Sequence, residues 1–160
     1  MYLKQSYTVC YIKRSDGKTL FLERNKKKND FNHAKFIGIG GKIEEDESPH
    51  ECVIREVYEE TGLKLESVNF CGLVKYYLNE DYFENMYVYY SDDYSGELKE
   101  CDEGSLHWLS FGEFIGKPHW ESDVLFIQKA IYGEKFPDME FFYDSKGIKS
   151  FNRLDEDNIL

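Results

Sequence analysis

The sequence predicts an α/β protein in which a mixed β-sheet lies between helices. The chain has 160 residues, a length typical of one domain with a substantial core. Strand-like apolar runs are interrupted by two helical segments. Aromatic residues, which strands favour, make up 17% of the chain. We therefore expect a single domain over residues 1–152, followed by a frayed acidic tail over residues 153–160.

The first part of the chain predicts two strands and then a glycine-rich segment. In order, it holds a strand at residues 7–13, a turn at Asp16-Gly17, a strand at residues 20–22, a basic loop at residues 24–35 and an apolar run at residues 36–39. Gly40 and Gly41 follow. Glycines permit backbone conformations closed to other residues, and they allow a ligand to approach the backbone closely.

A helix over residues 49–61 has the clearest local signals. Ser48 is its expected N-cap, and Glu51 completes a capping box. Gly62 is the expected stop signal. The buried side of this helix is expected at Val53 and Val57.

The rest of the chain predicts more strands and one further helix. We expect a hairpin of residues 68–77 and 82–91, a strand at 105–109, a helix at 122–132, and a closing hairpin of 139–143 and 148–151. The core residues of that second helix are expected to be Val124, Leu125, Ile127 and Ile131. This alternation of elements is what favours the mixed sheet between helices.

The composition excludes some classes of partner. A formal net charge of -11 argues against long nucleic acid, because phosphate backbones are held by Lys and Arg. A small phosphorylated substrate remains compatible if metal ions supply the positive charge. The N-terminus lacks a signal-peptide apolar region, and no apolar stretch reaches membrane-spanning length. We expect a cytoplasmic protein without a membrane partner, either a monomer or a homodimer.

The cysteines give no sign of a metal site or of disulfides. The chain has four of them, at positions 10, 52, 71 and 101, without a CxxC pair or a nearby His at zinc spacing. We expect free, buried thiols in a reducing compartment.

A cluster of carboxylates lies on the first helix. Glu56, Glu59 and Glu60 are spaced i, i+3 and i+4, so they share one side of a helix. Like charges on adjacent turns repel one another, and a hard divalent cation with oxygen ligands would relieve the repulsion. The alternative is an ordinary exposed helix with an acidic side. An EF-hand calcium site is not indicated, because the DxDxDG loop pattern is missing.

The same segment resembles the Nudix box, Gly-x5-Glu-x7-Arg-Glu-U-x-Glu-Glu-x-Gly-U, where U is apolar. The matching residues are Gly41, Glu47, Arg55, Glu56, Val57, Glu59, Glu60, Gly62 and Leu63. The resemblance implies the Nudix α/β/α sandwich and a phosphoanhydride hydrolase that uses Mg²⁺, with Mn²⁺ as a substitute. It also implies catalytic roles for the box residues. The implied metal ligands are the side chains of Glu56, Glu59 and Glu60 and the backbone carbonyl of Gly40, while Arg55 would pair with Glu47 and orient the carboxylates.

Two residues outside the box extend this resemblance. Glu103 lies just before a Trp-containing strand, where similar enzymes place a glutamate that reaches the metal site, either as a ligand or in activating water. The alternative for Glu103 is a solvated loop charge. Arg24 ends the second predicted strand, where relatives place a phosphate contact, and a plain surface arginine is the alternative. The number of metal ions and the identity of the general base stay open.

Other segments resemble the MutT-like 8-oxo-dGTP diphosphatase branch. There a Trp stacks on the purine and an acid bonds the base edge; Trp120 and Asp123 occupy those places. The 8-oxo base carries a proton on N7, which a carboxylate can accept, whereas normal guanine offers an acceptor there. The chain departs from the pattern at Ser122, where some members have a second acid, and at Ile37, where some have Asn. Further substrate contacts are expected at Phe36, Thr8 and Lys42.

The resulting expectation is a Mg²⁺-dependent nucleoside triphosphate pyrophosphohydrolase that acts on oxidised purines in nucleotide-pool sanitation and DNA repair. Other substrates keep the chemistry and remain alternatives: ADP-ribose, a dinucleoside polyphosphate or an RNA 5' end. A non-catalytic, nucleotide-sensing Nudix module is the alternative from another class. Against this alternative, every box glutamate is present.

Overall fold

The main sheet is five-stranded and mixed. The computed structural model describes residues 3–26, 32–78, 82–144 and 147–154. The strands lie in the order β1 (Leu3–Ile12), β6 (Tyr82–Ser91), β5 (Asn69–Leu78), β9 (Asp138–Asp144) and β10 (Gly147–Leu154). β1 pairs with β6 in parallel, and so does β5 with β9, whereas the other two pairings are antiparallel.

Two smaller sheets lie beside the main one. β3 (Phe36–Ile37), β2 (Thr19–Glu23) and β8 (Ser105–Leu109) form the first, with β2 in the middle. β4 (Lys64–Leu65) pairs with β7 (Tyr94–Ser95) in the second. β1 pairs with β6 along one edge, and residues 39–43 run along its other edge. There the N–H of Thr8 donates to the Gly41 carbonyl at 2.9 Å. This pairing places the glycine segment directly beside the main sheet.

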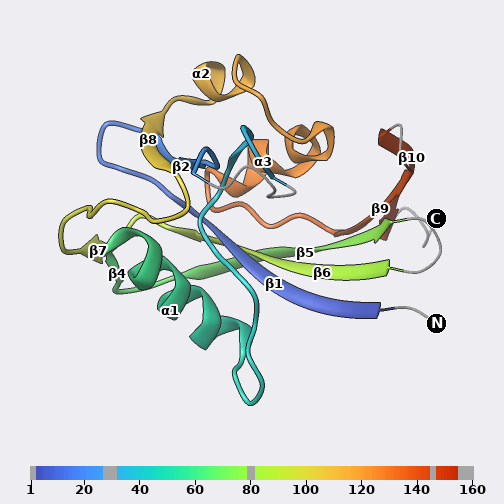
Figure 1. The fold of residues 1–160 in the computed structure, drawn as a ribbon, viewed down its shortest axis with the longest axis horizontal. Coiled ribbons are helices and arrows are strands. Elements are labelled where there is room, and N and C mark those ends of the chain that lie inside the picture. The colour runs from blue at the N-terminus through green and yellow to red at the C-terminus, as the bar shows by residue number, and fades with distance from the viewer. Residues whose placement is uncertain (1–2, 27–31, 79–81, 145–146, 155–160) are drawn as a thin grey trace.

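Helices cover both faces of the main sheet, as Figure 1 shows. α1 (Pro49–Thr61) lies on one face, and α2 (Phe111–Ile115) and α3 (Val124–Ala130) lie on the other. Each face has its own apolar core. The core under α1 includes Cys10, Val53 and Val57, and the core under α3 includes Phe126, Ile127 and Phe141. The expected mixed sheet between helices is therefore confirmed.

The helix over residues 49–61 has the predicted bounds, and Val53 and Val57 are fully buried as expected. The prediction for the last helix was wrong at Leu125, whose side chain is 41% exposed. α3 follows a short 3-10 turn, Glu121–Asp123, and its buried side is formed by Phe126, Ile127, Ala130 and the following Ile131. Val124 is only partly buried.

α2 was not anticipated, although the sequence contains its signal. Ser110 and Glu113 form a capping box of the same type as Ser48 and Glu51. The strand β10 includes positions 153 and 154 of the expected tail, and residues 155–160 lie outside the described part of the chain, as do residues 27–31 of the expected basic loop.

All four cysteines are buried and free, as expected. Among the described residues, no helix combines the length and the apolar character needed to span a membrane.

Candidate active site

The two ends of α1 are fixed by local hydrogen bonds. Ser48 Oγ accepts a hydrogen bond from the backbone N–H of Glu51 at 3.1 Å, and the Glu51 carboxylate accepts one from the Ser48 N–H at 3.0 Å. Gly62 ends the helix in the left-handed conformation, with φ of 82°. Because Val53 and Val57 face the sheet, the box residues share the adjacent side of the helix: Arg55, Glu56, Glu59 and Glu60.

Arg55 is the centre of a charged network on that side. Its guanidinium makes two bonds to Glu47, of 2.6 and 2.9 Å, and Nη1 donates to Glu56 at 2.9 Å and to Glu59 at 3.1 Å. It also donates to the Lys42 carbonyl at 3.2 Å. The bonds from Arg55 lower the pKa of Glu47 to about 2. Such a bidentate pair fixes the arginine, which in turn fixes the carboxylates that it touches.

The glycines beside this network are required by close packing. A Cβ on Gly41 would lie 2.4 Å from Cδ of Glu56, and a Cβ on Gly40 would lie 1.9 Å from the backbone oxygen of Thr8. Real side-chain contacts are never that short. A larger residue at Gly40 would press on the backbone of Thr8, whereas one at Gly41 would push the Glu56 carboxylate out of its place. Gly41 leaves room for the Glu56 carboxylate, and Gly40 lets its segment press against β1.

Glu60 carries the strongest electrostatic signal of the site. Its Oε2 is buried and has no hydrogen-bond partner. Burial, followed by hydrogen bonding to Glu103 and repulsion by it, raises the pKa of Glu60 to about 9. Burial also raises the pKa of Glu56, with Glu59 and Glu103 adding repulsion. An unpartnered carboxylate oxygen among other carboxylates is a donor set suited to a hard divalent cation.

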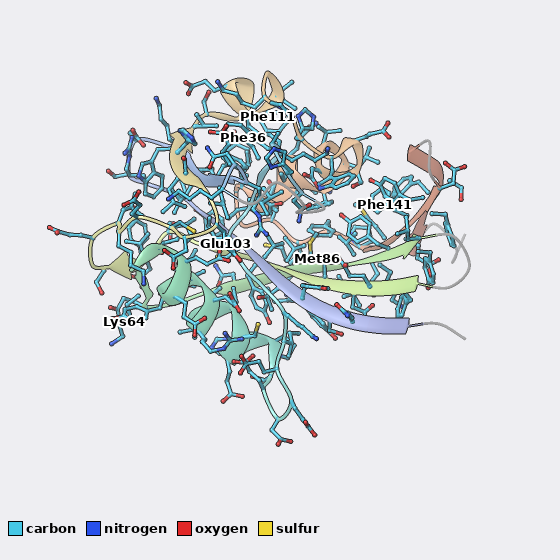
Figure 2. The ribbon with its side chains drawn as sticks, viewed as in Figure 1. Phe36, Lys64, Met86, Glu103, Phe111 and Phe141 are labelled. Carbon is cyan, nitrogen blue, oxygen red and sulfur yellow. The ribbon has the colours of Figure 1, made fainter. Side chains whose placement is uncertain are left out.

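Glu103 joins this cluster from the loop that precedes β8. Figure 2 shows it in the region between α1 and the small sheet. Its Oε2 lies 3.1 Å from Nη1 of Arg24, and the two side chains are mostly buried. Gly104 permits this approach, since a Cβ there would lie 1.9 Å from the Glu23 carbonyl oxygen. Arg24, expected to contact phosphate, therefore contacts a carboxylate of the cluster in this structure.

The expected metal ligands are only partly gathered. Glu56, Glu60 and Glu103 influence one another electrostatically, whereas Glu59 is 57% exposed and bonded to Arg55. Within the described ranges, no three His, Cys, Asp or Glu side chains already converge as a finished metal site. Glu56, Glu60 and Glu103 are mostly buried oxygen donors of the kind that a divalent cation prefers. The side chain of Glu59 would have to turn away from Arg55 to become a further ligand. Gly40 lies in the adjoining segment, pressed against β1.

Trp120 and Asp123 lie on the opposite face of the main sheet, at the start of α3. The indole N–H of Trp120 donates to Oδ1 of Asn32 at 2.6 Å, and the Lys35 ammonium lies 4.5 Å from the centre of the ring system. Asp123 is 6% exposed, and burial raises its pKa to about 7. Tyr11 and Tyr76 lie within electrostatic range of its carboxyl group. The two residues share one turn, in which the N–H of Asp123 donates to the Trp120 carbonyl at 3.0 Å. The sequence alone could not show what surrounds them.

The other expected substrate contacts are spread over both faces. Phe36 is buried and packs against His107, with ring centroids 5.4 Å apart, and Lys117 Nζ lies 5.8 Å from its ring. The Thr8 hydroxyl lies 3.3 Å from the Cys52 thiol of α1, on the face away from Trp120. The structure thus does not bring the Thr8 side chain together with Trp120. The side chain of Lys42 is exposed beside the box.

A cluster of hydroxyl groups beside Trp120 was missed by the sequence analysis. Tyr143 Oη donates to Ser122 Oγ at 2.7 Å, and Tyr76 Oη lies 3.4 Å from the same atom. The ring of Tyr143 also meets the Trp120 ring edge-on, at 6.2 Å and 83°. The tyrosines lie on predicted strands, but no local signal shows that β5 and β9 are neighbours. Their register brings both side chains over one end of the sheet.

Comparisons with known proteins identify the family. The NUDIX domain family matches residues 3–130. A relative from Danio rerio, named oxidized purine nucleoside triphosphate hydrolase, is 27% identical over 111 residues, which cover 69% of this chain and 71% of the relative. The uncharacterized Nudix hydrolase YvcI of Bacillus subtilis is 26% identical over 160 residues, covering 97% of each chain.

A solved structure supports the fold. The MutT protein from Bacillus halodurans has a TM-score of 0.79 and 23% sequence identity, and the match covers 92% of this chain and 96% of that one. The family match spans β1 to the end of α3 and includes the whole glutamate cluster. The chain accordingly belongs to the NUDIX family and is a Nudix hydrolase.

Proposed function

We propose that this enzyme hydrolyses nucleoside triphosphates with Mg²⁺ to a nucleoside monophosphate and pyrophosphate, and that it prefers oxidised purines such as 8-oxo-dGTP. The main support for the hydrolase activity is the buried, unpartnered oxygen of Glu60, on which both Glu56 and Glu103 act electrostatically. The base preference is supported by Trp120 and Asp123, and by the name of the relative from Danio rerio. The physiological role would be the removal of damaged precursors from the nucleotide pool.

The chain's own residues divide the work of phosphoanhydride hydrolysis. Glu56, Glu59, Glu60, Glu103 and the Gly40 carbonyl would hold Mg²⁺, or Mn²⁺ in its place. The bound cation supplies charge neutralisation for the phosphate oxygens. Arg55, fixed by Glu47, keeps the carboxylates in position. A water molecule attacks phosphorus in line, a carboxylate of the cluster accepts its proton, and the bond to the bridging oxygen breaks.

The base is recognised at a separate place in the fold. Trp120 would stack on the purine, and the Asp123 carboxylate would accept the N7–H bond that only the oxidised base offers. Burial of Asp123 makes this contrast large, because an undamaged base would leave a buried acceptor facing another acceptor. Phe36 would add an apolar wall.

A hydrolysis screen with Mg²⁺ tests the proposal. The panel contains 8-oxo-dGTP, dGTP, other normal triphosphates, ADP-ribose, a dinucleoside polyphosphate and a capped RNA 5' end. Pyrophosphate release from 8-oxo-dGTP should be far faster than release from dGTP. Equal rates would refute the sanitising role, and faster turnover of a different compound would replace the substrate.

A pair of matched variants tests the metal site. Glu60→Gln should lower turnover by at least about 100-fold, because it removes a charged ligand from the cluster. Glu45→Gln makes the same change in an exposed residue of the adjoining loop and should leave turnover unchanged. Full activity of Glu60→Gln would refute the assignment, and inactivity of the native enzyme towards the whole panel would favour a nucleotide-sensing module.

A further inference from the structure

The start of α3 is tied to the main sheet by one buried hydroxyl cluster. Ser122 is 1% exposed, and its Oγ accepts the 2.7 Å bond from Tyr143 while lying 3.4 Å from Tyr76 Oη. Tyr76 comes from β5 and Tyr143 from β9, and their rings are 6.0 Å apart. Within the turn, Ser122 lies between the two residues assigned to the base, Trp120 and Asp123.

Tyr143 contacts this turn in two ways. Its hydroxyl holds Ser122, and its ring meets the indole of Trp120 edge-on at 6.2 Å. Its hydroxyl group also lies within electrostatic range of Asp123. One side chain thus touches or influences every member of the turn. Tyr143 also lies beyond residues 3–130, the part of the chain that the family model matches, so this contact is supplied by the β9–β10 hairpin outside that range.

We propose that Tyr143 is a positioning residue for base selection. Through its contacts with Ser122 and Trp120 it fixes the turn that binds the nucleobase, and the β9–β10 hairpin thereby sets substrate selectivity. This inference rests on the proposed function, because it assigns the base to that turn. A buried hydroxyl pair has a directional bond at a fixed distance, which apolar packing alone does not provide. Loss of the bond therefore lets the Trp120 ring and the Asp123 carboxyl shift relative to each other.

The cluster lies on the other face of the main sheet from the α1 residues assigned to hydrolysis. Tyr76 and Tyr143 pack against the core on the α3 face, and Ser122 is bonded to Tyr143, whereas Val53 and Val57 of α1 belong to the core on the other face. In Figure 2, Met86 and Phe141 mark the core on the α3 face, and Glu103 lies towards α1. A change at Tyr143 should consequently alter how bases are distinguished while leaving the chemical step in place.

The test uses Tyr143→Phe, which keeps the ring against Trp120 and removes only the donor to Ser122. Tyr77→Phe is the matched control, because Tyr77 is the next residue after Tyr76 and its hydroxyl donates to Glu140 at 3.0 Å, away from the cluster. Steady-state kinetics on the nucleotide panel would give kcat and KM for each base. Calorimetry with 8-oxo-dGMP and dGMP, without metal, would give binding independently of turnover.

Tyr143→Phe should reduce the selectivity between the best and the poorest base about tenfold, through KM, with kcat within about twofold. Ser122→Ala should reduce selectivity at least as much, and the double variant should be no worse than Ser122→Ala alone, because both changes remove the bond between Tyr143 and Ser122. Tyr77→Phe should keep native selectivity. Equal losses for all bases, or unchanged selectivity in Tyr143→Phe, would overturn the inference and leave the hydrolase proposal intact.

The result that would refute the proposed function differs from the results that would overturn the role of Tyr143. A native enzyme that hydrolyses no compound of the panel would refute that function, and the monophosphate titrations would still decide the role of Tyr143. A native enzyme that hydrolyses and binds all bases equally would overturn the inference, since there would be no selectivity for the hairpin to set.

Discussion

Glu60 and Glu103 bring two carboxyl groups together at the C-terminal end of α1, and burial makes their repulsion costly. One oxygen of Glu60 is left without a partner, while Glu103 is bonded to Arg24 at 3.1 Å. The side chains come from segments far apart in the sequence. The pairing of β2 with β8 in the small sheet brings Arg24 and Glu103 next to each other.

Glu60→Gln should stabilise the metal-free protein at high pH. The pKa of Glu60 is raised from 4.5 to about 9 in the fold, so its contribution to stability is full below pH 4.5 and is lost as the pH rises through about 9. The variant lacks this dependence. Urea unfolding with EDTA at pH 6 and pH 9 should show a stability difference that grows with pH in favour of the variant; a difference that shrinks would contradict the assignment.

Asp123→Asn should remove a similar dependence in a lower pH range. The pKa of Asp123 is raised from 3.8 to about 7, so the native protein loses stability as the pH rises from about 4 to about 7. The shift corresponds to at most about 4 kcal/mol. Urea unfolding at pH 5 and pH 8 checks this. The free energy of unfolding of the variant, relative to that of the native protein, should be higher at pH 8 than at pH 5, by at most about 4 kcal/mol. A lower relative value at pH 8 would contradict the burial of an ionisable Asp123.

Gly41→Ala and Gly40→Ala should fail for different reasons. At Gly41 the new methyl group meets the end of the Glu56 side chain, which can turn away, so we expect a loss of about 100-fold in kcat with little loss of stability. At Gly40 it meets the backbone of Thr8, which cannot move without breaking the pairing with β1. Thermal unfolding and kinetics on both variants should separate the effects; a larger drop in Tm for Gly41→Ala would be inconsistent with this packing.

Arg55 and Glu47 should act as a unit. Arg55→Lys and Glu47→Gln each break the two-bond contact, so each should lower kcat/KM at least about tenfold. The double variant should lose much less than the product of the single losses, with a coupling of about 1 kcal/mol or more. Kinetics on the three variants measure this coupling. Strictly multiplicative losses would mean that the residues act independently.

Local signals in the sequence were sufficient for α1. Ser48, Glu51 and Gly62 specify its ends, and Val53 and Val57 specify its buried side, so the positions of the box glutamates on the helix followed directly. For the last helix, periodicity alone was misleading. Ile127 and Ile131 are buried as the periodicity predicted, but Leu125 is exposed and the neighbouring Phe126 is buried in its place.

Contacts between distant segments could not be predicted in this way. Nothing near Arg24 in the sequence indicates that it pairs with Glu103, and nothing near Tyr143 indicates Ser122. The first contact depends on the pairing of β2 with β8, which are not consecutive in the chain, and the second joins β9 to the turn before α3. Residue types and spacing therefore predicted which carboxylates share one side of α1, while the surroundings of Trp120 and Asp123 required the fold.

The parallel pairing of β1 with β6 has a consequence for how the enzyme is made. Its first pair joins Leu3 to Tyr82, so about half the chain must be synthesised before the sheet can begin to form. Pairings of such long sequence separation slow folding, whereas a capped helix forms early and locally. During synthesis, α1 would carry its acidic residues before Glu103 and Arg24 arrive beside them. The carboxylate cluster is thus completed late, in chains whose sheet is already assembled.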